Sequence, residues 1–228
     1  MYNYDRAILD NCVFNFIYGC ALHDAVLQKA YKGERKWIEE VADAKSAVKT
    51  YINQIINGDL SDKTKHDKVF LETAKKVCKK INNFKDRPDS AGDFHFGNAQ
   101  KLINMTVKHV YAHTYSIHLA SNNSCSIRKH FQYCHCPMDS IMLESVWAEY
   151  KDRFKEDKVK EDLGNDFRKA WGAEDFEANE DCAPHRYEAF QAAIKNIINP
   201  DQNIDDNLYP IEYDYIAWKA HNKNVHEN

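Results

Sequence analysis

The sequence predicts an all-α fold, and three observations support this prediction. Only 7 glycines and 5 prolines interrupt 228 residues, so few positions favour turns. Between them, apolar residues mostly recur with the 3.6-residue period of an amphipathic helix rather than with the alternation of a strand. The hydrophobic fraction of 43% is enough for one substantial core or for two small lobes that share an interface. We therefore expect residues 1–228 to form a single compact helical unit, two-lobed and with a cleft between the lobes.

Apolar faces and end signals define the first two expected helices. One face over residues 44–56 predicts a helix that ends at Gly58, where a left-handed backbone conformation would close it. A second face over residues 69–84 predicts a helix whose lysines point outward. Residues 85–92, KDRPDSAG, form the clearest loop. The apolar residues are Ala44, Ala47, Val48, Tyr51, Ile52, Ile55 and Ile56 in the first helix, and Val69, Val77, Ile81 and Phe84 in the second.

The later helices are predicted from the same signals. One begins at a turn around Gly97, and another follows Asp139. Pro184 is well placed as the first residue of a further helix that Pro200 ends, and a last short helix is expected around residues 211–218. Their apolar positions are Leu102, Met105, Val110 and Tyr111; Leu143, Trp147, Tyr150 and Phe154; Phe190, Ala193, Ile194 and Ile197; and Ile211, Tyr215 and Trp218.

Composition and charge limit the class of protein. No apolar run approaches the 18 or so residues that cross a bilayer, and residues 1–18 lack the charged-then-apolar order of a signal peptide. Seven cysteines, an odd number, indicate free thiols in a reducing compartment. We expect a cytoplasmic monomer that needs no cofactor and does not bind membranes. The formal net charge of −4 argues against a surface that is basic throughout.

One stretch is nevertheless basic. Residues 61–87, called the basic strip below, contain nine Lys/Arg against four Asp/Glu, a local charge of +5. Such a strip is either a solvated helix face or a surface that meets phosphate.

Two short segments place a lysine and an aspartate at predicted helix starts. In FGNAQKLIN (residues 96–104), Gly97 opens a turn and Lys101 follows at the head of a helix. In HCPMDSIML (residues 135–143), Pro137 and Asp139 form a second turn that ends in an N-cap. An aspartate after a proline is also typical of any capped helix. Together, however, the two segments suggest a nucleophile and an electrostatic stabiliser.

These segments resemble the helix-hairpin-helix (HhH-GPD) superfamily of DNA glycosylases. FHFGNAQKLIN is similar to the hairpin and second helix of that motif, and CPMDSIML is similar to the Pro-hydrophobic-Asp turn that follows it. The resemblance covers about a quarter of the chain. It divides the region into a hairpin and second helix at 85–112, an inserted loop at 113–133, and a turn and helix at 134–154.

The resemblance implies a DNA glycosylase that flips one base out of duplex DNA and hydrolyses its N-glycosidic bond, with or without cleavage of the strand. Asp139 would stabilise the positive charge that builds on the sugar as the base leaves. Lys101 would attack the sugar as a free amine in a strand-cleaving enzyme, or position the substrate otherwise. The hairpin residues would present backbone N–H groups to a DNA phosphate. These DNA-binding residues are Gly97, Asn98, Ala99 and Gln100.

Three departures from the family pattern indicate a divergent member with a specialised substrate. Ala99 replaces the usual second glycine, 38 residues separate Lys101 from Asp139, and the four-cysteine pattern of iron–sulfur members is absent. The base stays open: it could be oxidised, alkylated, or an enzymatically modified base of foreign DNA. Aromatic residues near the motifs are candidates for a base pocket or for the core, namely Phe94, Phe96, Tyr111, Tyr133 and Trp147.

Two other functions compete with the glycosylase hypothesis. His109 and His113 share a helix face and, with Cys134 and Cys136, would supply four ligands to a zinc ion that supports a hydrolase or braces the inserted loop. The Cys-x-Cys spacing is a poor match to known zinc motifs. Alternatively, the chain is a non-catalytic helical module that binds nucleic acid or protein through residues 63–87.

Overall fold

The computed structural model describes residues 6–26, 35–121, 126–153, 171–173, 176, 183–199 and 208–226. Within these ranges the chain is helical and has no β-strand, which confirms the all-α prediction. No helix in this part of the chain has the length and apolar character needed to span a bilayer. The α-helices are α1 (Arg6–Val26), α2 (Arg35–Glu39), α3 (Ala42–Ile56), α4 (Lys63–Asn82), α5 (Phe96–Ser121), α6 (Ser140–Arg153), α8 (His185–Ile198) and α9 (Pro210–His226), and two short 3₁₀ helices are η1 (Ser126–Phe131) and η2 (Trp171–Ala173).

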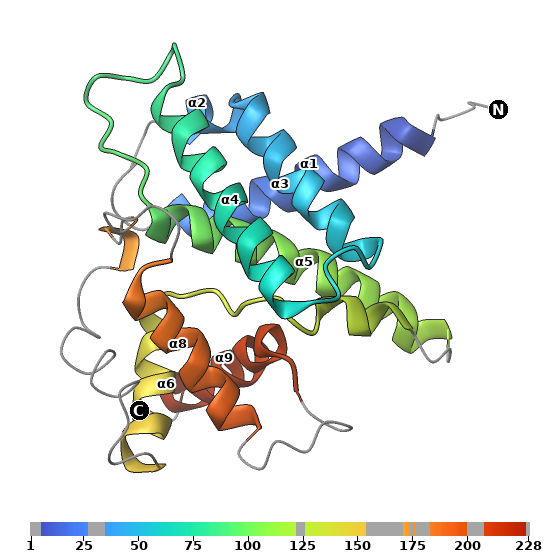
Figure 1. Cartoon of the computed structure of the whole chain (residues 1–228), viewed down its shortest axis with the longest axis vertical. Coiled ribbons are helices and arrows are strands. Elements are labelled where there is room, and N and C mark those ends of the chain that lie inside the picture. The colour runs from blue at the N-terminus through green and yellow to red at the C-terminus, as the bar shows by residue number, and fades with distance from the viewer. Residues whose placement is uncertain are drawn as a thin grey trace.

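The helices form two groups (Figure 1). Helices α1 to α5 pack together in one group, and α6, α8 and α9 pack together in the other. Residues 134–139 have no regular secondary structure and link the groups, entering α6 at Ser140. We call residues 134–139 the connecting segment.

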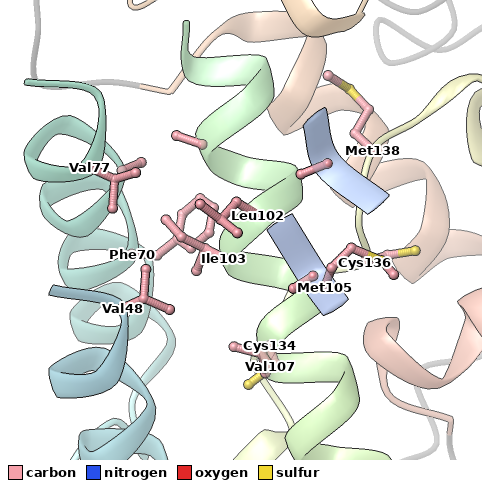
Figure 2. Packing of buried hydrophobic residues seen from close by; sticks show 14 of the residues in the cluster. Val48, Phe70, Val77, Leu102, Ile103, Met105, Val107, Cys134, Cys136 and Met138 are labelled. Carbon is pink, nitrogen blue, oxygen red and sulfur yellow. The ribbon is translucent and has the colours of Figure 1, made fainter. Parts of the chain in front are cut away.

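Helix α5 lies at the centre of the core. Its residues are buried without a break from Phe96 to Val107. Figure 2 shows Leu102 and Ile103 facing Phe70 of α4, with Cys136 and Met138 of the connecting segment on the other side of the helix in this view. A helix buried on all sides is normally apolar. Along this stretch, however, α5 carries Asn98, Gln100, Lys101, Asn104 and Thr106, and such buried polar groups need partners.

Helix ends agree with most of the local signals. Gly58 has φ +76° just after α3, as its end signal predicts. Helix α4 begins earlier than its apolar face indicates, because Asp62 caps it by accepting a hydrogen bond from the Lys65 N–H at 2.8 Å. Helix α8 begins one residue after Pro184, which takes the cap position. Pro200 lies outside the described residues.

The expected loop over residues 113–133 is wrong in its first part. Helix α5 continues to Ser121, and η1 occupies residues 126–131. Local contacts sustain the helix past His113: Tyr115 stacks on Tyr111 one turn earlier, with ring centroids 5.7 Å apart, and the Thr114 hydroxyl donates to the Val110 carbonyl. The interval between Lys101 and Asp139 therefore consists largely of a longer helix.

Candidate active site

Lys101 and Asp139 lie together in the interior. Lys101 Nζ is 3.2 Å from Asp139 Oδ2, and their side chains are only 5% and 9% exposed. The pair forms because the connecting segment passes beside α5 and brings residue 139 next to residue 101. A charge pair this deeply buried is costly to assemble, so its presence marks the location as a candidate site.

Asp139 uses its two carboxylate oxygens differently. Oδ1 accepts a hydrogen bond from the Met142 N–H at 2.9 Å, which makes Asp139 the N-cap of α6. Oδ2 faces Lys101. The carboxylate is thus held in one orientation by the helix, with one oxygen directed at the lysine.

Lys101 is covered by η2. Its ammonium lies 4.7 Å from the centroid of the Trp171 ring, a cation–π contact. The Trp171 backbone lies directly on Gly97, where any Cβ would overlap the Trp171 carbonyl. Gly97 therefore permits a close approach of η2 to the start of α5, and this approach places the indole ring over Lys101.

The structure corrects the expected hairpin. Gly97, Asn98, Ala99 and Gln100 belong to the first turns of α5 and are buried, the last two completely. The prediction that they present N–H groups to a DNA phosphate is therefore wrong for this arrangement. The reason is that η2 and the connecting segment, which come much later in the sequence, cover them.

Gln100 instead holds the connecting segment. Its amide Nε2 donates to the Met138 carbonyl at 2.7 Å, and its Oε1 accepts from the Met138 N–H at 3.0 Å. Gln191 of α8 makes the same pair of hydrogen bonds with the backbone of Cys136, at 2.7 and 3.1 Å. Two glutamine amides thus satisfy the backbone of the segment as strand neighbours would and position Asp139. The sequence signals did not indicate Gln191.

Replacing Gln100 by Met should lower the free energy of unfolding by about 2 kcal/mol or more, because two buried backbone groups of Met138 lose their partners. Urea denaturation measures this change. Gln54→Met is the matched control, since Gln54 Oε1 is buried without a hydrogen-bond partner in the described part of the chain. Equal effects of the two substitutions would contradict the role given to Gln100.

Replacing Gly97 by Ala should displace η2, since the new methyl group would overlap the Trp171 carbonyl. The expected result is a red-shifted tryptophan emission and faster reaction of Lys101 with an amine reagent, mapped by mass spectrometry. Gly19→Ala in α1 is the control, because nothing lies within 4 Å of a Cβ at that position. Both substitutions raise the intrinsic helix propensity by the same amount, about 1 kcal/mol, so they differ only in the overlap with Trp171. An unchanged rate of Lys101 modification would show that η2 does not cover the site.

A second polar cluster lies between α4 and the connecting segment. Asp67 Oδ1 is 3.0 Å from His135 Nε2 and 3.3 Å from His66 Nδ1. The other ring nitrogens meet tyrosine hydroxyls: His135 Nδ1 is 2.9 Å from Tyr187 Oη, and His66 Nε2 is 2.8 Å from Tyr51 Oη. All of these residues except Asp67 are buried. Each ring nitrogen therefore has a specific partner.

Burial and hydrogen bonding shift the pKa values of this cluster in opposite ways. Burial lowers the pKa of His135 to about 4, so its ring is neutral at pH 7. Burial opposes ionisation of Asp67, but hydrogen bonds from His135, His66 and Lys63 outweigh it and hold the pKa of that carboxyl below its ordinary value. The cluster at neutral pH thus contains an ionised carboxylate and a neutral His135 ring.

The two polar clusters are connected. Asn104 Nδ2 donates to Tyr187 Oη at 3.0 Å and lies 3.3 Å from Gln100 Oε1. A chain of hydrogen bonds therefore runs from His135 through Tyr187, Asn104 and Gln100 to the backbone just before Asp139.

A pocket of about 820 Å³ opens between α4 and α8, beside the second cluster. Asp67, His135 and Tyr187 line it, together with Phe70 and several lysines. None of the aromatic residues proposed from sequence lines this pocket. Phe94, Phe96 and Tyr111 are buried in the core, and Tyr133 and Trp147 are partly buried.

The zinc group that competed with the glycosylase hypothesis is not assembled. His109 Nε2 faces Asp24 of α1 at 3.7 Å, and His113 is exposed. Cys134 and Cys136 are buried, and burial raises the pKa of both thiols, which disfavours the thiolate that binds metal. In the described ranges, the one His/Cys/Asp/Glu group with metal-site spacing is His66, Asp67 and His135.

Comparisons of this chain with protein-family models, with curated proteins and with solved structures found no match.

Proposed function

We propose that this chain is a DNA glycosylase that excises a damaged or modified base by hydrolysing its N-glycosidic bond. The observation that carries the proposal is the buried Lys101–Asp139 pair, with Asp139 fixed as the cap of α6. The two residues singled out from sequence, 38 positions apart, meet at 3.2 Å.

Asp139 is the electrostatic stabiliser in this proposal. As the base leaves, positive charge develops on the deoxyribose, and a carboxylate directed at that carbon lowers the barrier. The effect is stronger in a site from which water is excluded, because the effective dielectric constant is low. Since the α6 cap already fixes the carboxylate, little reorganisation is needed during the reaction. Asp139 can also accept a proton from the attacking water.

Lys101 has two possible roles that differ in products. As a nucleophile, its free amine forms a bond to C1′ of the sugar while the bond from C1′ to the base breaks, and the base leaves with a proton. Asp139 Oδ2, 3.2 Å from Nζ, lies where it can take the proton that Lys101 must lose first. The product is an aminal, and it becomes a Schiff base when the bond from C1′ to the ring oxygen O4′ breaks and O4′ takes a proton from the nitrogen. The Schiff base permits cleavage of the strand. As a positioning cation, Lys101 stays protonated and only hydrolysis follows.

The site is closed, so substrate binding must open it. Trp171 packs over the ammonium of Lys101, and this cation–π contact is worth about 0.5–2 kcal/mol. A flipped nucleotide would displace the indole ring and take its place beside the pair. Unstacking the base requires a few kcal/mol, which contacts along the DNA backbone must offset.

The basic strip on α4 offers those backbone contacts. Lys65, Lys68, Lys76 and Lys79 are all exposed on this helix. We propose that they meet phosphates of duplex DNA and that the protein acts as a cytoplasmic monomer. Binding should then weaken steeply with salt. Salt-dependent binding without any product would instead favour a non-catalytic binding module.

The decisive assay for the proposal uses duplexes that carry oxidised, alkylated or enzymatically modified bases. Strand breaks that appear only after alkali indicate hydrolysis alone, and a covalent adduct after borohydride treatment indicates an amine nucleophile. We expect activity on a narrow set of modified bases. Failure to release any of them would contradict the proposal, and release of common lesions alone would overturn the specialised substrate.

Lys108→Gln is the matched control for Lys101→Gln in the borohydride assay. Lys108 lies two turns further along α5, is also largely buried and pairs with Asp214. If Lys101 is the nucleophile, the adduct is lost in Lys101→Gln and kept in Lys108→Gln, provided that circular dichroism shows both variants folded. An adduct in the Lys101 variant would assign the amine elsewhere.

A further inference from the structure

We propose that His66, Asp67 and His135 form a binding site for a divalent transition-metal ion, separate from the Lys101–Asp139 pair. Their ligand atoms, His66 Nδ1, Asp67 Oδ1 and His135 Nε2, all lie within 4.8 Å of one another. Two imidazoles and one carboxylate suit Zn²⁺ and similar ions rather than Mg²⁺ or Ca²⁺. Three protein ligands with one open position are typical of a reactive zinc site.

The two distances from Asp67 Oδ1 to the ring nitrogens are close to those of a tetrahedral ion, and the two ring nitrogens lie within 4.8 Å of each other. With metal–ligand bonds of about 2.0–2.1 Å, two ligands of a tetrahedral zinc ion lie about 3.3–3.4 Å apart. Asp67 Oδ1 is 3.3 Å from His66 Nδ1 and 3.0 Å from His135 Nε2. An ion can therefore bind between these atoms with small side-chain movements.

Tyrosine hydroxyls orient both histidine rings, as hydrogen-bond partners commonly orient histidines that bind a metal. Tyr51 Oη lies 2.8 Å from His66 Nε2, and Tyr187 Oη lies 2.9 Å from His135 Nδ1, the ring nitrogens that would not bind the metal. Each tyrosine oxygen can accept the ring N–H that remains when the opposite nitrogen binds metal. Asn104 in turn donates to Tyr187, so the orientation of His135 is fixed through two layers of contacts.

The fourth position faces the pocket between α4 and α8. Asp67 and His135 line that pocket, whereas His66 is fully buried behind them. Lys63 pairs with Asp67 Oδ2 at 2.6 Å, which leaves Oδ1 as the ligand oxygen. Lys63 and Lys195 also line the pocket, and their charges favour an anionic fourth ligand such as inorganic phosphate.

Without metal, the same atoms form a proton-linked network in which both rings donate to Asp67 Oδ1. The two states are distinguished by titrating chelator-treated protein with Co²⁺, which absorbs visible light strongly when tetrahedral. We expect one equivalent to bind, Zn²⁺ to displace it, and added phosphate to change the spectrum. His135→Gln and Asp67→Asn should abolish the absorption. His130→Gln, which alters a partly buried histidine outside the group, should retain it.

Nitrogen NMR of the histidine rings in the wild-type protein tests which residues bind the metal, and it does not require that any variant folds. Of the eleven histidines, Zn²⁺ should shift the rings of two only, with metal on Nδ1 of His66 and on Nε2 of His135. Binding of less than one equivalent, or shifts at other histidines, would overturn the proposal and leave the cluster as a hydrogen-bonded network. Because neither measurement depends on DNA, the outcome is independent of the glycosylase proposal.

Discussion

Replacing Asp139 by Asn is expected to reduce base excision by at least about 10²–10³-fold, the loss typical when one preorganised electrostatic group is removed from an active site. Asparagine caps helices as well as aspartate does, so the bond from the Met142 N–H to the side-chain oxygen is kept. What is lost is the negative charge that the proposed mechanism places opposite the sugar. Single-turnover measurement of base release, with excess enzyme, gives the rate of the chemical step.

Asp62→Asn is the control for this substitution. Asp62 caps α4 in the same way, by accepting a hydrogen bond from the Lys65 N–H, but it is exposed and pairs with no buried lysine among the described residues. Excision should be unchanged in this variant. If Asp139→Asn excises bases at the wild-type rate while folded, then Asp139 is only a helix cap.

Replacing Lys101 by Met should lower the free energy of unfolding by about 3–5 kcal/mol, because the substitution leaves a buried carboxylate without its counter-ion. Methionine keeps most of the apolar volume of the lysine stem, so the loss reports the charge rather than a cavity. Urea denaturation at constant pH measures the change.

The double variant Lys101→Met/Asp139→Asn distinguishes the interaction between the two charges from the effect of each single substitution. Since no unpaired charge then stays buried, we expect it to recover most of the stability lost in Lys101→Met, while excision stays absent. A double-mutant cycle with a coupling energy near zero would show that solvent screens the two charges, and the buried pair would then not describe the protein in solution.

Features encoded by nearby residues could be predicted from the sequence. Gly58 ends α3, the apolar face of 44–56 lies inside, and Asp139 after Pro137 caps α6. Each of these depends on a few consecutive residues whose backbone preferences are local. The approach of Lys101 to Asp139 was suggested by a family resemblance, and the structure shows the contact without testing its role.

Features that depend on distant segments could not be predicted. Burial of Gly97 results from η2, more than 70 residues later, and Gln191 reaches the backbone of Cys136 from α8. The cluster of His66, Asp67 and His135 joins α4 to the connecting segment, and no spacing rule relates residues so far apart. The alternative zinc group at 109–136 is not assembled for the opposite reason: residues close in sequence point to different neighbours.

The most direct test of the central claim is to detect free bases released from DNA by mass spectrometry, comparing wild-type protein with Asp139→Asn. The DNA should include oxidised, alkylated and enzymatically modified samples, so that no single substrate is assumed. The glycosylase proposal predicts that wild-type protein releases one or a few modified bases and that Asp139→Asn releases none above background. Release of no base by folded wild-type protein, or equal release by both proteins, would contradict it.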